Sequence, residues 1–179
     1  PAMKNEEIQQ AIVYQARQPM VRLGKAAVAL PPGGFLQAVP EAEAAMAGFA
    51  AEAVAGASKV CDLYSGVGTF TFRLAEVASV HAVDSSELAI QALLNATGTA
   101  TGIKAVTAEA RDLFRRPLLA QDLRHVQAVV FDPPRAGAEA QAAQIAASGA
   151  ARAIGVSCNP VTFARDARIL TAAGFRLER

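Results

Sequence analysis

The sequence predicts an α/β fold in which a parallel sheet carries helices on both faces. From residue 59 onward, apolar stretches of strand length alternate with stretches of helical spacing, which is typical of parallel sheets. Residues Val60–Phe70 combine an apolar strand, a glycine turn and the start of a helix. Hydrophobic residues make up 53% of the 179 residues and charged residues 18%, which indicates one compact domain rich in buried strands.

The segment before residue 59 predicts a different organisation. Residues 5–18 have the apolar spacing of a short helix. Residues 20–30 alternate around Gly24-Lys25, which predicts a hairpin. A helix is expected over residues 40–55, with Pro40 in the first turn, where proline is tolerated.

The alternating part predicts five complete strands. They cover residues 59–64, 79–84, about 103–108, 126–131 and 151–157. The expected helices cover residues 69–77, 86–96, a short stretch after Asp112, 138–148 and 161–173. Residues 175–178 look like the start of a sixth strand, so we expect the sheet to be truncated at its C-terminal edge.

The glycine turn predicts a binding site for a nucleoside. Gly66 and Gly68 let the backbone turn sharply and approach a ligand closely. Asp84 follows at the end of the next strand, where doubly wound sheets place a carboxylate for a ribose diol. Thr69 and its neighbours replace the third glycine of a dinucleotide fingerprint, so the turn suits a nucleoside without a pyrophosphate.

Polar residues stand at the carboxyl ends of four predicted strands, at Asp62, Asp84, Asp132 and Cys158. Ligands of open parallel sheets gather at this edge. Asp132 begins the turn Asp132-Pro133-Pro134-Arg135, in which the prolines stiffen the loop and Arg135 offers a fork for a phosphate or carbonyl oxygen. The alternative is a rigid surface turn.

Cys158 is a predicted nucleophile. It stands where a strand ends and a helix begins, and helix N-termini favour the thiolate. Asn159-Pro160 shapes the turn, whereas Cys61 is mid-strand and is expected in the core. Addition of a thiolate to carbon 6 of uracil makes carbon 5 nucleophilic, which a methyl sulfonium donor requires and which amino or hydroxyl targets do not need.

Together these motifs resemble the uracil-5 RNA methyltransferases, enzymes with the Rossmann-like class I methyltransferase fold. The resemblance lies in Phe35–Gln37, Asp62–Phe70, Asp132–Arg135, and Ser157–Pro160 followed by Thr162. The Leu30–Gln37 lead-in is most similar to the branch that methylates 23S ribosomal RNA. It implies that Cys158 is the nucleophile. It also implies contacts to S-adenosylmethionine from Gln37, Tyr64, Thr69, Asp84 and Asp132, although Thr69 replaces an asparagine common in the family.

Further site residues are predicted from their positions. Gly66 and Gly68 are expected to line the cofactor, and Asp112 is a possible partner of the adenine amino group. Arg135, Asn159 and Pro160 are assigned to the substrate side.

The resemblance also implies a domain division. Residues 1–34 would be a remnant of a central domain, and residues 35–179 a cofactor-binding domain that is incomplete at its C-terminus. The family's general base, a glutamate, would lie beyond Arg179, so we expect this chain to bind cofactor but to turn over weakly. The RNA-binding barrel and iron–sulfur cluster common in the family are not expected in this segment.

Charge and cysteine content limit the partners and the location. A net charge of +1 does not by itself predict RNA binding, so a local patch is needed. One candidate patch, with a solvated helix end as its alternative, comprises Arg111, Arg115, Arg116 and Arg124. Two distant cysteines and no apolar run of membrane length predict a reducing, cytoplasmic location without a metal site. We interpret His81 and His125 as structural.

Two other functions agree with parts of the pattern. An amino-directed nucleic-acid methyltransferase would keep the cofactor site and Asp132 but make Cys158 incidental. A non-catalytic nucleoside-binding module would keep only the fold.

Overall fold

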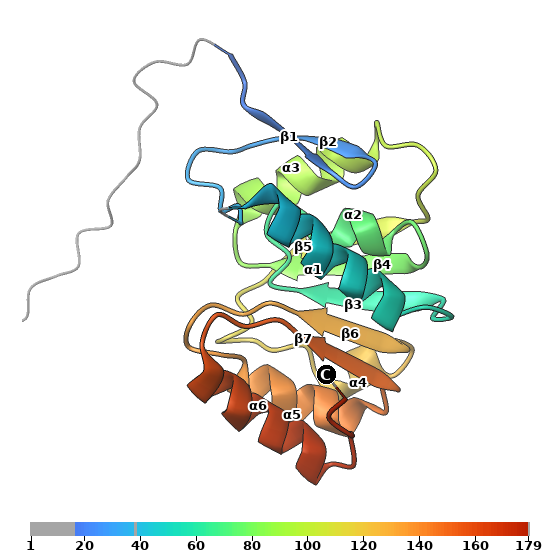
Figure 1. The fold of residues 1–179 in the computed structure, drawn as a ribbon, viewed down its shortest axis with the longest axis vertical. Coiled ribbons are helices and arrows are strands. Elements are labelled where there is room, and N and C mark those ends of the chain that lie inside the picture. The colour runs from blue at the N-terminus through green and yellow to red at the C-terminus, as the bar shows by residue number, and fades with distance from the viewer. Residues whose placement is uncertain (1–16, 38, 179) are drawn as a thin grey trace, which may run out of the picture.

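The computed structural model describes residues 17–37 and 39–178, and these contain a five-stranded parallel sheet in the order β5-β4-β3-β6-β7 (Figure 1). The strands are β3 (Lys59–Leu63), β4 (Ser79–Asp84), β5 (Val106–Ala110), β6 (Ala128–Phe131) and β7 (Arg152–Gly155). The strand order reverses between β3 and β6. In this architecture the reversal marks where a ligand site forms, at the carboxyl ends of the strands.

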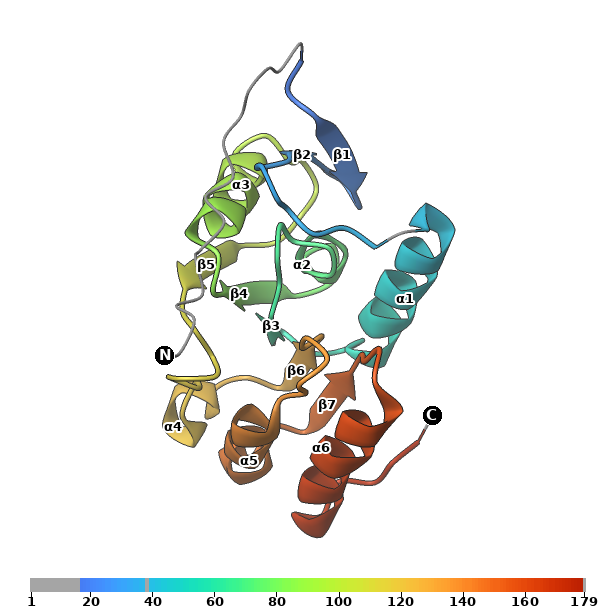
Figure 2. The same ribbon diagram turned by 90° about the vertical axis from the view of Figure 1, so that its left-hand side faces the viewer.

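Helices cover both faces of the sheet, as the sequence predicts (Figure 2). They are α1 (Pro40–Ala53), α2 (Thr71–Leu74), α3 (Glu87–Thr97), α4 (Ala120–Leu123), α5 (Glu139–Ser148) and α6 (Pro160–Ala172). α1, α2 and α3 lie on one face, where Val60 and Val130 join the core with Phe70. α4, α5 and α6 lie on the other, where Leu63 and Phe131 pack. No helix of the described residues is long and apolar enough to span a membrane.

The predicted hairpin forms a separate two-stranded sheet, β1 (Met20–Leu23) and β2 (Ala26–Ala29). Its turn contains Gly24 at φ +52°, a conformation that glycine adopts without strain. Leu23 and Val28 are buried in the cluster that also contains α3. The expected helix over residues 5–18 lies almost wholly outside the described residues, and the domain boundary after residue 34 stays a prediction.

Two expected elements differ in length or register. The helix expected over 69–77 shortens to α2, because residues 75–77 form turns instead. The strand expected over 103–108 forms later in the chain, as β5 at Val106–Ala110. The Lys104 N–H bonds to the Ala75 carbonyl instead, and the pairing with β4 begins at Val106.

The short helix expected after Asp112 forms as α4, with a turn between it and Asp112. Asp112 Oδ1 accepts the backbone N–H groups of Phe114 (2.9 Å) and Arg115 (3.3 Å), which closes a turn there. The helix α4 forms only after Pro117, at residues 120–123.

The expected sixth strand is also wrong for the described residues, because 175–178 have no strand pairing. Phe175 N–H bonds to the Leu170 carbonyl, and the Phe175 ring packs on the core beside α5 and α6.

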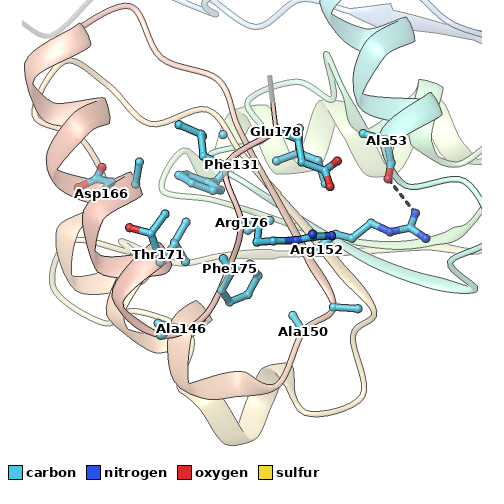
Figure 3. A pocket seen from close by; sticks show the side chains of 18 of the residues that line it. Ala53, Phe131, Ala146, Ala150, Arg152, Asp166, Thr171, Phe175, Arg176 and Glu178 are labelled. Carbon is cyan, nitrogen blue, oxygen red and sulfur yellow. Dashed lines mark hydrogen bonds between the residues drawn. The ribbon is translucent and has the colours of Figure 1, made fainter.

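A cavity of about 1000 Å³ borders β7 between α1 and α6 (Figure 3). Across it, Arg152 donates to the carbonyls of Ala53 and Ala55 (2.8 Å each) at the end of α1. None of the predicted site residues lines this cavity.

Candidate active site

The glycine turn after β3 is held by the carboxylate that ends β4. Asp84 Oδ2 accepts the Gly66 N–H at 2.8 Å, and Asp84 Oδ1 accepts the Ser86 N–H at 2.8 Å. Ser86 in turn caps α3 by accepting the Ala89 N–H. The predicted pair of glycine turn and acidic strand end is therefore brought together by direct hydrogen bonds.

The two positions in this turn require glycine for different structural reasons. Both have positive φ, +55° at Gly66 and +103° at Gly68. A Cβ on Gly66 would meet nothing within 4 Å, so this side of the turn is open. A Cβ on Gly68 would lie 2.6 Å from the Phe72 ring, so Gly68 is needed for packing. The sequence pattern does not separate these roles.

Asp62 is a fully buried carboxylate at the end of β3. Its Oδ2 accepts a hydrogen bond from Thr71 Oγ1 (2.5 Å), whereas Oδ1 and the neighbouring Ser65 Oγ have no partner among the described residues. Burial raises the pKa of Asp62 to about 7 against the opposing Thr71 bond, and the charges of Asp132 and Asp84 add to the rise. The sequence showed Asp62 near the strand end but gave it no role, and it did not indicate that one carboxylate oxygen is buried without a partner among the described residues.

Replacing Asp62 by asparagine should make stability less dependent on pH. The pKa of Asp62 is about 7 in the fold against 3.8 ordinarily, so the folded chain takes up this proton at higher pH than the unfolded chain. The contribution of Asp62 to the free energy of unfolding therefore rises as pH falls from about 8 to about 4. We expect Asp62→Asn to raise the melting temperature at pH 8 and to flatten its change between pH 8 and 5. Thermal unfolding measures both. An unchanged slope, equal to that of the exposed control Glu41→Gln, would contradict the burial effect.

Asp132 follows β6 and forms a hydrogen bond with the lead-in segment, Leu30–Gln37. Its backbone N–H donates to the Leu63 carbonyl (3.3 Å), which sets it beside the end of β3. Gln37 Nε2 donates to Asp132 Oδ2 at 3.4 Å, so two residues 95 apart in sequence meet as the motifs predict. Burial raises the pKa of Asp132. Asp62, Asp84 and Asp132 thus place three carboxyl groups at this edge of the sheet.

Cys158 lies exposed just beyond β7. The following residue, Asn159, caps α6 by accepting the Val161 N–H on Oδ1 (3.0 Å), and Pro160 is the first helical residue. Asn159 Nδ2 also donates to the Arg135 carbonyl at 3.0 Å, which ties the cysteine loop to the loop after β6. The Arg135 guanidinium is exposed and has no hydrogen bond or ion pair within the part of the chain described. It is therefore free to bind an anionic or carbonyl group.

Alkylation should distinguish the two cysteines of the folded chain. Cys61 is fully buried, and burial, followed by the charge of Asp62, raises the pKa of its thiol. Cys158 is exposed. We expect iodoacetamide to label Cys158 alone in native buffer and both cysteines in denaturant, as read by peptide mass spectrometry. Labelling of Cys61 at a comparable native rate would contradict its place in the core.

Three predicted cofactor contacts have surroundings that the sequence did not indicate. The Tyr64 ring packs against Phe114, with centroids 5.8 Å apart, beside a cavity of about 570 Å³ near α5. Burial raises the pKa of Tyr64, and the charges of Asp166 and Asp112 add to this. The Asp112 carboxylate is engaged by its own turn, and Thr69 lies in the turn leading to α2.

The basic patch suggested by the sequence is partly neutralised. Arg111 pairs with Glu109 (3.2 Å), and Arg115 pairs with Asp112 (3.5 Å). Arg124 donates to His125 Nε2. This favours the alternative of a solvated surface. Among the residues that the structure describes, no group of three histidine, cysteine or acidic side chains is placed to hold a metal ion.

Comparison with known proteins identifies the fold and the sequence family. A family profile described as tRNA (Uracil-5-)-methyltransferase matches residues 4–177. The chain belongs to this family. It is 60% identical over 167 residues to an uncharacterized RNA methyltransferase of Caulobacter vibrioides, covering 93% of this chain and 40% of that protein.

Two further similar proteins have more specific names. The 23S rRNA (uracil(1939)-C(5))-methyltransferase of Chromohalobacter salexigens is 36% identical over 151 residues, 83% of this chain and 31% of that protein. The crystal structure of the Pyrococcus abyssi tRNA (uracil-54, C5)-methyltransferase with S-adenosyl-L-homocysteine superposes with a TM-score of 0.74 at 29% identity, covering 88% of this chain and 38% of that one. The fold is therefore that of S-adenosylmethionine-dependent methyltransferases, and the chain spans less than half the length of these relatives.

Proposed function

We propose that this chain carries the catalytic centre of an RNA methyltransferase that moves a methyl group from S-adenosylmethionine to carbon 5 of a uridine through a covalent Cys158 adduct at carbon 6. The observation that carries the proposal is the position of Cys158. It is exposed, and Asn159 ties its loop to the Asp132–Arg135 turn. That turn begins at the acidic edge of the sheet, which supports a nucleophile close to the proposed cofactor site.

The acidic edge suits a ligand with positive charge. Asp62 Oδ1 has no partner among the described residues, Asp132 has a raised pKa, and Gly66 leaves its ligand side open. S-adenosylmethionine, which carries a sulfonium and an ammonium group, supplies an electrophilic methyl group when bound. Asp84 is the proposed partner of its ribose hydroxyls. The other proposed contacts are Gln37, Tyr64, Gly66, Thr69, Asp112 and Asp132, with Gly68 shaping the turn.

Cys158 would act on the uracil ring before methyl transfer. Its thiolate sulfur bonds to carbon 6, and the electron pair of the ring double bond moves through carbon 5 to the carbonyl oxygen as an enolate. Carbon 5 would then bond to the methyl carbon while the bond from that carbon to the sulfonium sulfur breaks, and the neutral thioether S-adenosylhomocysteine would leave. A base removes the carbon 5 proton, the double bond re-forms, and the sulfur leaves as a thiolate. Arg135 would hold a carbonyl or phosphate oxygen of the target, which must be unstacked to reach the cysteine.

Ribosomal RNA is the proposed substrate, on the basis of the lead-in motif and the 36% identity to the 23S enzyme. We place the protein in the cytoplasm, where rRNA is found and where free thiols such as Cys61 and Cys158 persist. The test is transfer of labelled methyl groups to rRNA hairpins and to tRNA, with the product nucleoside identified by mass spectrometry. We expect 5-methyluridine in rRNA; an N-methylated base would indicate the amino-directed alternative. Absence of S-adenosylmethionine binding in calorimetry would reject the cofactor assignment.

A further inference from the structure

One face of α6 holds the backbone of the loop that follows the Asp132–Arg135 turn. Thr162 Oγ1 donates to the Arg135 carbonyl (3.2 Å), in addition to the Asn159 bond to the same oxygen. One turn further along, Arg165 Nη2 donates to the Ala136 carbonyl at 2.9 Å. Residues three apart share one face of a helix, so these donors form a row.

The row ends at a buried carboxylate. Asp166 is only 2% exposed, and its Oδ2 accepts the Ala138 N–H at 2.6 Å. Its Oδ1 lies 2.8 Å from Arg165 Nη2 and accepts the Arg165 Nε–H at 2.9 Å. A buried carboxylate that is both ion-paired and bonded to a backbone amide has one favoured position, because losing either partner would leave a charge desolvated.

Gly137 shows how tightly the loop fits against this face. Its φ is +76°, and its N–H donates to the Pro134 carbonyl at 2.8 Å. A Cβ at this position would lie 2.5 Å from Arg165 Nη2 and 2.7 Å from Asp166 Oδ2. The loop backbone therefore rests directly on the polar groups of α6.

We propose that Thr162, Arg165 and Asp166 are positioning residues that fix Arg135 relative to Cys158. This rests on the proposed function. Cys158 precedes α6 by two residues, so the helix that carries the cysteine also clamps the loop carrying Arg135. The clamp acts on residues 135–138, whereas Asp132 is set independently by β3 and Gln37. Loosening the clamp should thus affect the substrate side more than the cofactor side.

The variants are Arg165→Ala and the milder pair Thr162→Val and Thr162→Ser. Valine keeps the shape of threonine without its hydroxyl donor, and serine keeps the donor. Arg168→Ala is the matched control, because Arg168 lies exposed on the same helix and its side chain has no partner among the described residues. Each variant is compared with the parent chain for S-adenosylmethionine affinity, for the rate of covalent adduct formation with 5-fluorouridine RNA, and for hydrogen exchange of the Ala138 amide.

We expect Arg165→Ala to slow adduct formation and to speed Ala138 exchange by about tenfold or more, as loss of a charge-assisted bond implies. Cofactor affinity should change by less than about threefold, since the Asp84 and Gly66 contacts remain. Thr162→Val should show a smaller effect of the same kind, restored in Thr162→Ser.

Equal effects in Arg168→Ala, or unchanged exchange of the Ala138 amide in Arg165→Ala, would overturn the proposal that α6 positions the loop. A parallel loss of cofactor affinity would show a general structural role and would also overturn it. If the parent chain forms no adduct, the proposed function of this chain fails, whereas the exchange of Ala138 still decides whether α6 holds the loop.

Discussion

Replacing Cys158 by alanine should abolish adduct formation with 5-fluorouridine RNA and remove 5-methyluridine from the product, while S-adenosylmethionine still binds. Without the sulfur, carbon 5 of uracil is too weak a nucleophile to accept the methyl group. The expected loss is about a thousandfold or more, the size seen when a catalytic nucleophile is removed. Denaturing electrophoresis of the RNA adduct measures the first effect, and calorimetry measures cofactor binding.

The fold should tolerate this change. The Cys158 side chain is exposed, whereas α6 is capped by Asn159 and begins at Pro160, neither of which is altered. The melting temperature of Cys158→Ala should match that of the parent within a few degrees. An adduct that survives in Cys158→Ala would reject this residue as the nucleophile. Methylation that survives without any adduct would instead favour the amino-directed alternative.

Replacing each glycine of the turn by alanine should have a different main effect, on stability at Gly68 and on cofactor affinity at Gly66. At Gly68, the substitution combines φ +103° with a contact of 2.6 Å to the buried Phe72 ring. We expect a loss of about 2–5 kcal/mol in the free energy of unfolding, from backbone strain and overpacking together. At Gly66, the Cβ would enter open space, so only the cost of a left-handed residue applies, about 1 kcal/mol.

Cofactor binding gives the second half of this prediction. The open side of Gly66 faces the proposed ligand, so Gly66→Ala should weaken S-adenosylmethionine binding by about tenfold or more through steric exclusion. Urea unfolding and calorimetry on the two variants separate stability from affinity. Gly149→Ala is the control for strain alone, because Gly149 has φ +78° and no atom near its Cβ position. Equal cofactor affinity in Gly66→Ala and the parent would contradict the assignment of the ligand side.

Most of the sheet was predictable because its strands have clear local sequence patterns. β3, β4 and β6 are short apolar runs with an aspartate at or next to the carboxyl end, and the alternation with helices implies parallel pairing. The errors fall where local signals compete with tertiary contacts. β5 is displaced because pairing with β4 fixes its register, and Phe175 leaves the strand pattern because its ring packs against α5 and α6.

The sequence by itself determined the family, the order of strands and helices, and the residue types at the carboxyl ends of the strands. These follow from spacing along the chain, which the motifs carry directly. Only the tertiary structure decided that Gly66 and Gly68 differ in role, that Asp62 is buried with an unsatisfied oxygen, and that α6 clamps the loop after β6. The physical reason is that burial, charge coupling and the direction of a Cβ depend on neighbours distant in sequence. The contacts that Arg165 and Asp166 make with the loop are not visible in the chain, because they go to backbone atoms of Ala136 and Ala138, about 28 residues away, which no side-chain pattern records.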